Sequence, residues 1–239
     1  MQTDLAVALA LAVAGGLYLR ALAVLSGRGR PVGRPQKAAF WLGLALSGAG
    51  LFSPLDRLSD DLLSAHMAQH LLIAEMGAPL LLLGVRSPVL LFLLPQPALK
   101  RVARLRRLRK LLGFLARPLV AVPLYILVLY AWHLGFMFEG ALRSEALHVL
   151  QHWSFVGISV LVWWSALEPH RRRLRGELWK VLHIFAARMG GMMLGMAFLA
   201  MRTPAYAGYY GARAREHGLT PIGDQQMAGG MMLSLDFVI

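Results

Sequence analysis

Two pairs of histidines, each spaced four residues apart, are the residues of this chain best suited to hold a metal ion. His66 and His70 form the first pair, and His148 and His152 form the second. Residues four apart on an α-helix lie on one face about one turn from each other, so the two imidazoles of a pair can chelate one ion. Both segments share the pattern His-x-x-Gln-His, whose glutamine could orient a ligand through a hydrogen bond.

A fifth histidine, His133, follows Trp132 near the end of another apolar segment. Counting about 1.5 Å per helical residue from the segment ends places all five imidazoles roughly 8–15 Å below one surface of a bilayer. Ionisable side chains at that depth are costly unless they pair, bind a ligand or line a cavity. We therefore predict one metal site formed by His66, His70, His133, His148 and His152. Asp224, at the start of the last apolar segment, either caps that helix or adds an oxygen ligand.

Sulfur chemistry in this chain is restricted to methionine. There are 12 methionines and no cysteine, which excludes disulfides, thiolate metal sites and thiol nucleophiles. Thioethers are soft ligands that suit Cu(I), although methionine at helical spacing is more often part of a packed core. Met192 and Met196 are the accessory candidates for the metal site.

The composition indicates which elements position these residues. Of 239 residues, 57% are hydrophobic and 15% are charged, whereas soluble domains have about 45–50% and about 25%. We predict an all-α, polytopic membrane helix bundle, formed as a single transmembrane domain over residues 1–239, with about seven transmembrane helices. The predicted spans are 5–25, 38–53, 60–84, 118–138, 143–167, 178–201 and 224–239. The first is expected to be a retained helix because no basic residues precede it, and the last is short or continues beyond Ile239.

The formal net charge of +13 is distributed unevenly along the chain. Basic residues cluster in the loops at 28–37, 97–117 and 170–176, and acidic residues fall in the alternate loops. By the positive-inside rule, the N-terminus and the histidine-rich ends of the helices lie outside. The segment 97–117 has apolar residues at helical spacing, so it could lie on anionic lipid or receive a partner. Membrane topology explains the charge, and no nucleic acid is expected.

Several smaller features complete the predicted arrangement. Residues 88–94 are too few to span and are expected to be re-entrant or interfacial. His183 and His217 fall outside the predicted metal site, near the inner face and in an outer loop. Glu75 and Arg188 are expected to form an ion pair, a structural role that we favour over a proton relay. Glycines at 191, 195, 229 and 230 predict close packing of the last two helices.

These motifs together resemble those of a known family. They are His66-Met67-Ala68-Gln69-His70 followed by Pro79-Leu80-Leu81-Leu82-Leu83-Gly84, Trp132-His133, His148 with His152, and Asp224-Gln225-Gln226-Met227-Ala228-Gly229. Over about residues 40–239, the chain resembles the CtaG-type bacterial cytochrome c oxidase assembly factors, polytopic proteins linked to maturation of copper-containing terminal oxidases. A cysteine-based, single-span copper chaperone that shares the CtaG name is excluded because the chain lacks cysteine.

The resemblance implies an assembly factor rather than an enzyme, in the bacterial cytoplasmic membrane, with cytochrome c oxidase subunits and the lipid bilayer as partners. The leading hypothesis is therefore copper binding and delivery from an outward-facing site, with zinc or haem as alternative occupants. A haem- or metal-binding membrane redox protein is the first alternative, because histidines on separate helices can ligate haem. A transporter would need polar groups across the whole bilayer, and a diiron oxygenase would need bridging carboxylates. Nothing in the sequence sets an oligomeric state.

Overall fold

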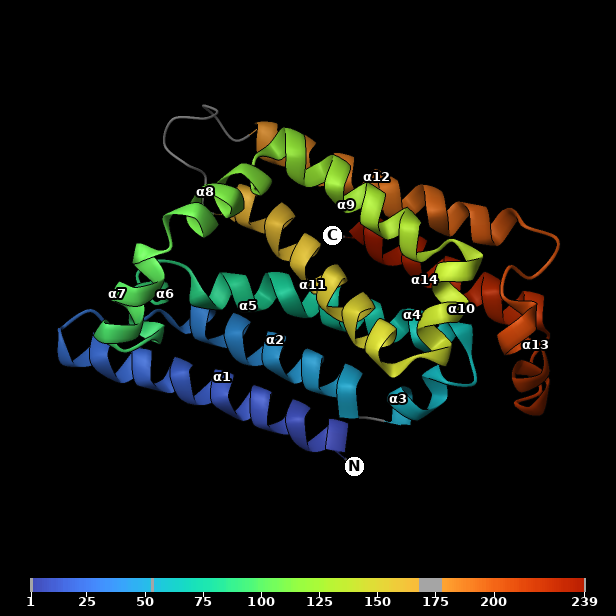
Figure 1. Ribbon diagram of the computed structural model, residues 1–239, viewed down its shortest axis with the longest axis horizontal. Helices are drawn as coiled ribbons and strands as arrows, with labels where there is room; N and C mark the ends of the chain where they lie inside the picture. The colour runs from blue at the N-terminus through green and yellow to red at the C-terminus, as the bar shows by residue number, and fades with distance from the viewer. Residues whose placement is uncertain (1, 53, 168–177, 239) are drawn as a thin grey trace.

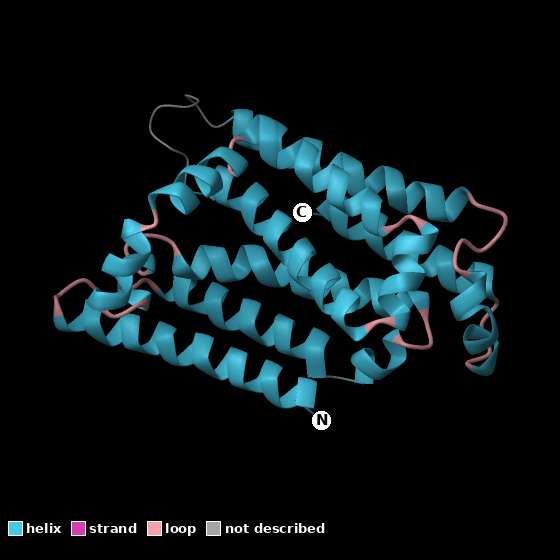
Figure 2. Ribbon diagram, viewed as in Figure 1, coloured by secondary structure: helices cyan, strands magenta, loops and turns pink. Residues whose placement is uncertain are grey.

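A computed structural model describes residues 2–52, 54–167 and 178–238, and every regular element in these ranges is a helix (Figures 1 and 2). The all-α prediction is confirmed. Long helical rods lie on each of the seven predicted segments, but the one predicted over 118–138 ends at Trp132, before the separate helix α10 (Gly135–Arg143). They are α1 (Gln2–Gly27), α2 (Arg34–Phe52), the continuous rod of α4 (Leu63–His70), η1 (Leu71–Gly77) and α5 (Ala78–Val85), α9 (Pro118–Trp132), α11 (Glu145–Leu167), α12 (Leu178–Ala200) and α14 (Pro221–Val238).

Short helices connect these rods at both ends of the bundle. One end carries α3 (Pro54–Ser59), α10 (Gly135–Arg143) and α13 (Ala207–Glu216), and we call it the α13 end (Figure 1). The other, the α8 end, carries α6 (Leu90–Leu93), α7 (Gln96–Arg104) and α8 (Arg106–Leu115). Successive rods run in opposite directions, so the start of α4, the end of α9 and the start of α11 all meet at the α13 end.

Four helices among the described residues are long and apolar enough to cross a membrane: Val7–Gly27, Leu63–Val85, Glu145–Leu167 and Leu178–Ala200. A fifth candidate combines α8 with α9, which are bent by 78° at their junction. By itself α9 has only 15 residues. Helix α14 carries Asp224 and Asp236 within its 18 residues, and α2 begins with Arg34 and Lys37. The structure therefore supports four to five spans, and seven remains a prediction.

Gly195 and Gly229 allow α12 and α14 to pack closely, as predicted, whereas a Cβ atom on Gly230 would meet nothing within 4 Å. A Cβ atom placed on Gly195 would lie 2.8 Å from the carbonyl oxygen of Gly229, and one on Gly229 would lie 2.7 Å from the carbonyl oxygen of Gly195. Side chains at these positions would force the backbones apart, since small residues are what allow such close helix contacts. This packing fixes α14 beside the rods that carry the polar residues described below.

The basic segment forms two amphipathic helices, α7 and α8, that meet at Leu105. Their residues are exposed along almost the whole length, including the apolar Val102, Leu108 and Leu112. Helix α6 has four residues, which agrees with the prediction that 88–94 is too short to span. The basic residues of 170–176 lie outside the described ranges.

Candidate metal centre

Four histidines converge at the α13 end, where α4 and α11 face each other. Within α4, the Nε2 atoms of His66 and His70 are 2.8 Å apart, and within α11 those of His148 and His152 are 3.0 Å apart. Each pair therefore shares one helix face, as its spacing predicts. His66 is fully buried and His70 is 8% exposed, so neither of the two imidazoles on α4 is solvated.

The two pairs also meet across the helix interface. Ring centroids are 4.6 Å apart for His70 and His152, and 5.3 Å apart for His66 and His148. One ring nitrogen from each of His66, His70 and His148 lies within 4.8 Å of the others. Tetrahedral zinc bound by imidazoles needs nitrogens roughly 3.4 Å apart, given metal–nitrogen bonds of about 2.0–2.1 Å. A small readjustment of these side chains would bring three nitrogens to that separation.

The pairing of identical groups gives this cluster its chemical character. Between two facing Nε2 atoms at most one hydrogen bond forms, and it leaves the remaining lone pairs and protons to other partners. In the described part of the chain, the buried Nδ1 of His152 meets no hydrogen-bond partner. Buried polar groups are normally satisfied, and unsatisfied ones need an explanation such as a bound ion. Convergent imidazoles without competing donors constitute a cluster suited to metal ligation.

The fifth predicted histidine, His133, lies apart from these four. It follows the last residue of α9, and its Nδ1 donates to the carbonyl oxygen of Leu129 at 2.7 Å. Phe138 and Phe155 lie beside it, with ring centroids 6.0 and 6.2 Å from its own, and both also contact the four-histidine cluster. The structure thus brings together His66, His70, His148 and His152, and His133 packs against two aromatic rings beside them.

Asp224 neither caps its own helix nor contacts the histidines, the two roles that the sequence suggested. Its carboxylate accepts hydrogen bonds from the backbone amides of Leu63, at 2.7 Å, and Ser64, at 3.0 Å. These amides begin α4, where free N–H groups and the helix dipole favour an anion. Asp224 therefore caps α4 from α14, and it positions the histidines through that helix rather than by contact with them.

Gln69 and the candidate methionines also differ in position from what the sequence suggested, whereas Gln151 on α11 interacts with His66. Gln69 donates to the carbonyl oxygen of Gly50 at 3.0 Å and to Asp56 at 2.7 Å, so it ties α4 to its neighbours rather than to an imidazole. Met196 is 57% exposed, and Met192 lines a separate crevice with Trp163 and Phe185. The accessory ligands proposed from sequence are therefore not brought to the cluster.

A small cavity of about 40 Å³ lies beside the cluster and carries two other methionines. Met67 and Met232, both buried, line it together with His70 and His133. Its remaining polar wall is formed by Glu75, Tyr125 and Asp236. Met67 lies between the two histidines of α4, which is a signal in the sequence that could have identified it.

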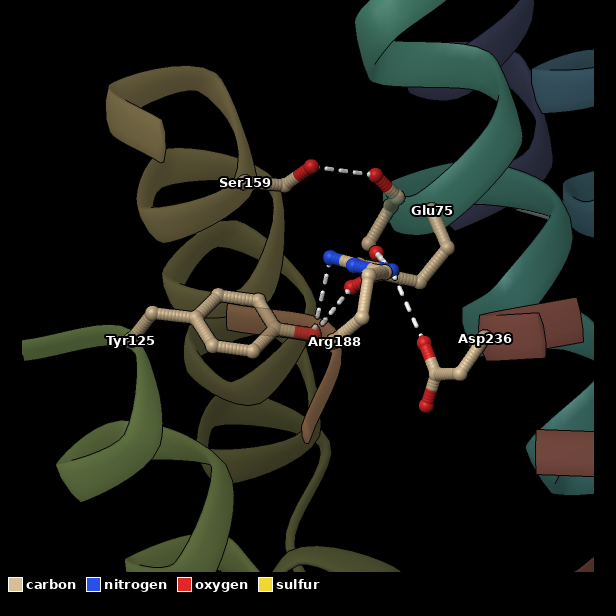
Figure 3. A network of polar contacts seen from close by, with 6 residues as sticks. Glu75, Tyr125, Ser159, Arg188 and Asp236 are labelled. Carbon is tan, nitrogen blue, oxygen red and sulfur yellow. Dashed lines mark hydrogen bonds and ion pairs between the residues drawn. The ribbon is translucent and has the colours of Figure 1, made fainter. Parts of the chain in front are cut away.

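The cavity ends at a buried ionic network, shown in Figure 3. Arg188 on α12 pairs with Glu75 on η1 and with Asp236 on α14, the latter at 3.0 Å. Tyr125 donates to Glu75 at 2.9 Å and accepts a hydrogen bond from Arg188 at 3.2 Å. The predicted Glu75–Arg188 ion pair is confirmed. Asp236 was missed, although an acidic residue in an apolar segment is the signal that identified Glu75.

The π-helix η1 directly follows His70 in the chain and carries Glu75 of this network. Pro79 follows it closely and lacks the N–H that would bond to the carbonyl of Glu75, which loosens the regular helix there. Ser159 on α11 donates to the carbonyl oxygen of Ala74 at 2.6 Å, so a side chain satisfies part of the altered backbone (Figure 3). Helix π-turns occur often at functional sites, and here the turn carries Glu75.

Polar groups cover the α13 end above the histidines. Asp56 and Asp60 lie close enough to His148 to interact with it electrostatically, and partial burial together with Asp56 raises the pKa of Asp60. Tyr206 donates to the carbonyl oxygen of His133 at 2.7 Å, and burial raises the pKa of Tyr206.

The two remaining histidines have other partners. His217 pairs with Asp61 at 3.1 Å on the surface of the α13 end, and His183 donates to the carbonyl oxygen of Val162 at 2.9 Å. Both histidines lie outside the cluster, as predicted.

The fold and site define a helical membrane protein with a buried histidine cluster at one end of its bundle. The chain belongs to the cytochrome c oxidase caa3 assembly factor family (Caa3_CtaG), whose model matches residues 16–239. This match confirms the resemblance inferred from the motifs and extends it towards the N-terminus. No curated protein and no solved structure matched the chain.

Proposed function

We propose that the protein assists assembly of a copper-containing cytochrome c oxidase by binding copper at the four-histidine cluster and passing it to an oxidase subunit. The observation that carries this proposal is the convergence of His66, His70 and His148, with ligand atoms within 4.8 Å, in a member of an oxidase assembly family. The role is that of a metal carrier rather than an enzyme.

The ligand chemistry suits transfer. Imidazole nitrogen binds copper and zinc, and the absence of thiolates avoids the tight soft-ligand binding that would retain Cu(I). Neutral imidazoles leave the charge of the ion uncompensated, so a cation gains from nearby acidic groups. Asp56 and Asp60 beside His148 supply negative charge on the path from the surface to the cluster.

The same proposal sets the orientation in the bacterial cytoplasmic membrane. With seven spans and the N-terminus outside, the α13 end faces outward, and α7 and α8 lie on the cytoplasmic surface. The support is the run of basic residues in α7 and α8, since positive loops remain in the cytoplasm. Reporter fusions test this topology: a periplasm-active reporter that functions from 97–117 would contradict it.

The haem alternative has less support from this packing. Axial ligation requires a macrocycle between imidazoles on separate helices, whereas the rings of His70 and His152 pack with centroids 4.6 Å apart and those of His66 and His148 with centroids 5.3 Å apart. The neighbouring cavity of about 40 Å³ is far smaller than a porphyrin. An absorption spectrum of the purified protein with a haem band would reverse this preference.

The function is tested in cells that carry His66→Ala together with His148→Ala. We expect the oxidase polypeptides to be made at normal levels but to contain less copper and to assemble poorly, and added copper should partly restore activity. His217→Ala, which removes an exposed histidine, serves as the matched control. Full copper content and normal turnover in the double variant would argue against delivery.

A further inference from the structure

The cavity beside the cluster contains a histidine whose free nitrogen has the properties of a ligand. A backbone carbonyl can only accept, so the bond to Leu129 requires that the proton of His133 is on Nδ1. Its Nε2 therefore carries a lone pair, and this buried atom meets no hydrogen-bond partner in the described ranges. Metal-binding histidines are commonly held in this way, with the second ring nitrogen donating to a carbonyl.

Two thioethers share the cavity wall with this nitrogen. Met67 comes from α4 and Met232 from α14, and they are only 2% and 4% exposed. Thioether and imidazole together favour Cu(I) over harder cations such as Mg²⁺ or Ca²⁺. His70 lines the cavity as well and also belongs to the four-histidine cluster, so the two positions adjoin each other.

The ionic network supplies charge for a cation in the same space. Glu75 and Asp236 are both carboxylates, and among the described residues Arg188 is the cation that pairs with both of them. When both acids are ionised, the three groups carry one net negative charge, which is costly in an apolar interior. Both carboxylates line the cavity, so a monovalent cation there would balance that charge.

We propose that His133, Met67 and Met232 form a second site for Cu(I), next to the four-histidine cluster. This inference rests on the proposed function and deepens it, because an ion could then occupy two adjoining positions within the helix bundle. The volume of about 40 Å³ exceeds the roughly 10–15 Å³ that a single water needs, so it admits an ion stripped of most of its hydration shell.

The test uses the full-length protein in detergent, titrated anaerobically with Cu(I) against a competing chelator and then measured by X-ray absorption at the copper edge. We expect two Cu(I) ions per chain, with both nitrogen and sulfur scatterers around copper. Met67→Leu with Met232→Leu should reduce binding to one ion and remove the sulfur signal. Met193→Leu with Met196→Leu removes the same number of thioethers from exposed positions and should change neither result.

Two further variants separate this inference from the proposed function. His133→Ala should also reduce binding to one ion, whereas His66→Ala with His148→Ala should leave one ion with sulfur neighbours. Should a double variant fail to fold, each single methionine variant should still lower the sulfur signal. A parent protein that binds one Cu(I) with nitrogen neighbours alone would refute the second site and leave the four-histidine cluster standing. A parent protein that binds no copper would instead overturn the proposed function, and with it this inference.

Discussion

The ionic network and the four-histidine cluster are buried in the same helix bundle, and they satisfy their polar groups in opposite ways. In the network, Arg188 meets Glu75 and Asp236, and Tyr125 bonds to both Arg188 and Glu75. In the cluster, like groups face each other, with Nε2 atoms 2.8 and 3.0 Å apart. Opposite charges and hydrogen bonds hold the network together, whereas the cluster consists of groups that can act as metal ligands.

This difference in polar partners suggests different roles for the two regions. A buried network in which one cation bridges two carboxylates rigidifies the bundle, because removing that cation leaves both acids unpaired. Imidazoles whose Nε2 atoms face other imidazoles gain few hydrogen bonds from the fold, and a bound ion would take up their free lone pairs. We therefore expect the network to govern stability and the cluster to govern metal binding.

The largest expected effect comes from removing the centre of the network. Arg188→Met leaves Glu75 and Asp236 facing each other without a cation, and breaking a buried pair in this way costs about 3–5 kcal/mol. Thermal unfolding in detergent measures the loss. Adding Glu75→Gln and Asp236→Asn to Arg188→Met should recover most of the lost stability. An Arg188→Met variant as stable as the parent would show that the network does not stabilise the fold.

The next effect is a loss of metal-dependent stabilisation. An ion that binds only the folded state at about 100 times its Kd adds about 2.7 kcal/mol to the free energy of unfolding. Copper should raise the melting temperature of the parent accordingly and should raise that of His66→Ala with His148→Ala by clearly less, because only the second site remains in this variant. His217→Ala should respond as the parent does; equal shifts in all three proteins would place the copper elsewhere.

A smaller effect is expected where Asp224 caps α4. Asp224→Ala frees the amides of Leu63 and Ser64, and loss of such a cap costs about 1–2 kcal/mol. Gln226→Ala, on an exposed position of the same helix, is the control. We also expect weaker copper binding in Asp224→Ala, because α4 carries His66 and His70. Unchanged stability in chemical or thermal unfolding would remove Asp224 from the scaffold of the site.

The smallest effect is expected at an ion pair on the surface, which serves as a comparison for the buried pairs of Arg188. Arg143 and Glu139 pair at 3.0 Å on α10, and the Arg143 side chain is 63% exposed. Exposed pairs four residues apart on a helix contribute about 0.3–0.5 kcal/mol. Glu139→Gln should therefore change the unfolding free energy by about that amount in thermal unfolding. A loss as large as that of Arg188→Met would mean that burial does not explain the difference between the two pairs.

The sequence predicted those features that depend on local spacing or on apolar content. Helices lie on all seven predicted segments, and each histidine pair shares a face because four residues make about one turn. Glu75 and Arg188 were paired correctly because charges deep in apolar segments need partners.

Features that depend on how one helix rotates against another were not predicted. His133 lies near the same end of the bundle, but its ring packs beside Phe138 and Phe155 rather than within the four-histidine cluster. Met192 faces a different crevice, whereas Met232 on the neighbouring helix lines the cavity. Spacing gives the face that a residue shares with others on its own helix, and tertiary packing decides which neighbour that face meets.

The central claim is that the four converging histidines bind the metal, and the most direct test is the metal content of the full-length protein after equilibration with copper or zinc. The parent should retain metal through gel filtration in detergent, and His70→Ala with His152→Ala, which removes one imidazole from each helix, should retain much less of either ion. If this double variant bound copper and zinc as well as the parent does, the histidine cluster would not be the metal site.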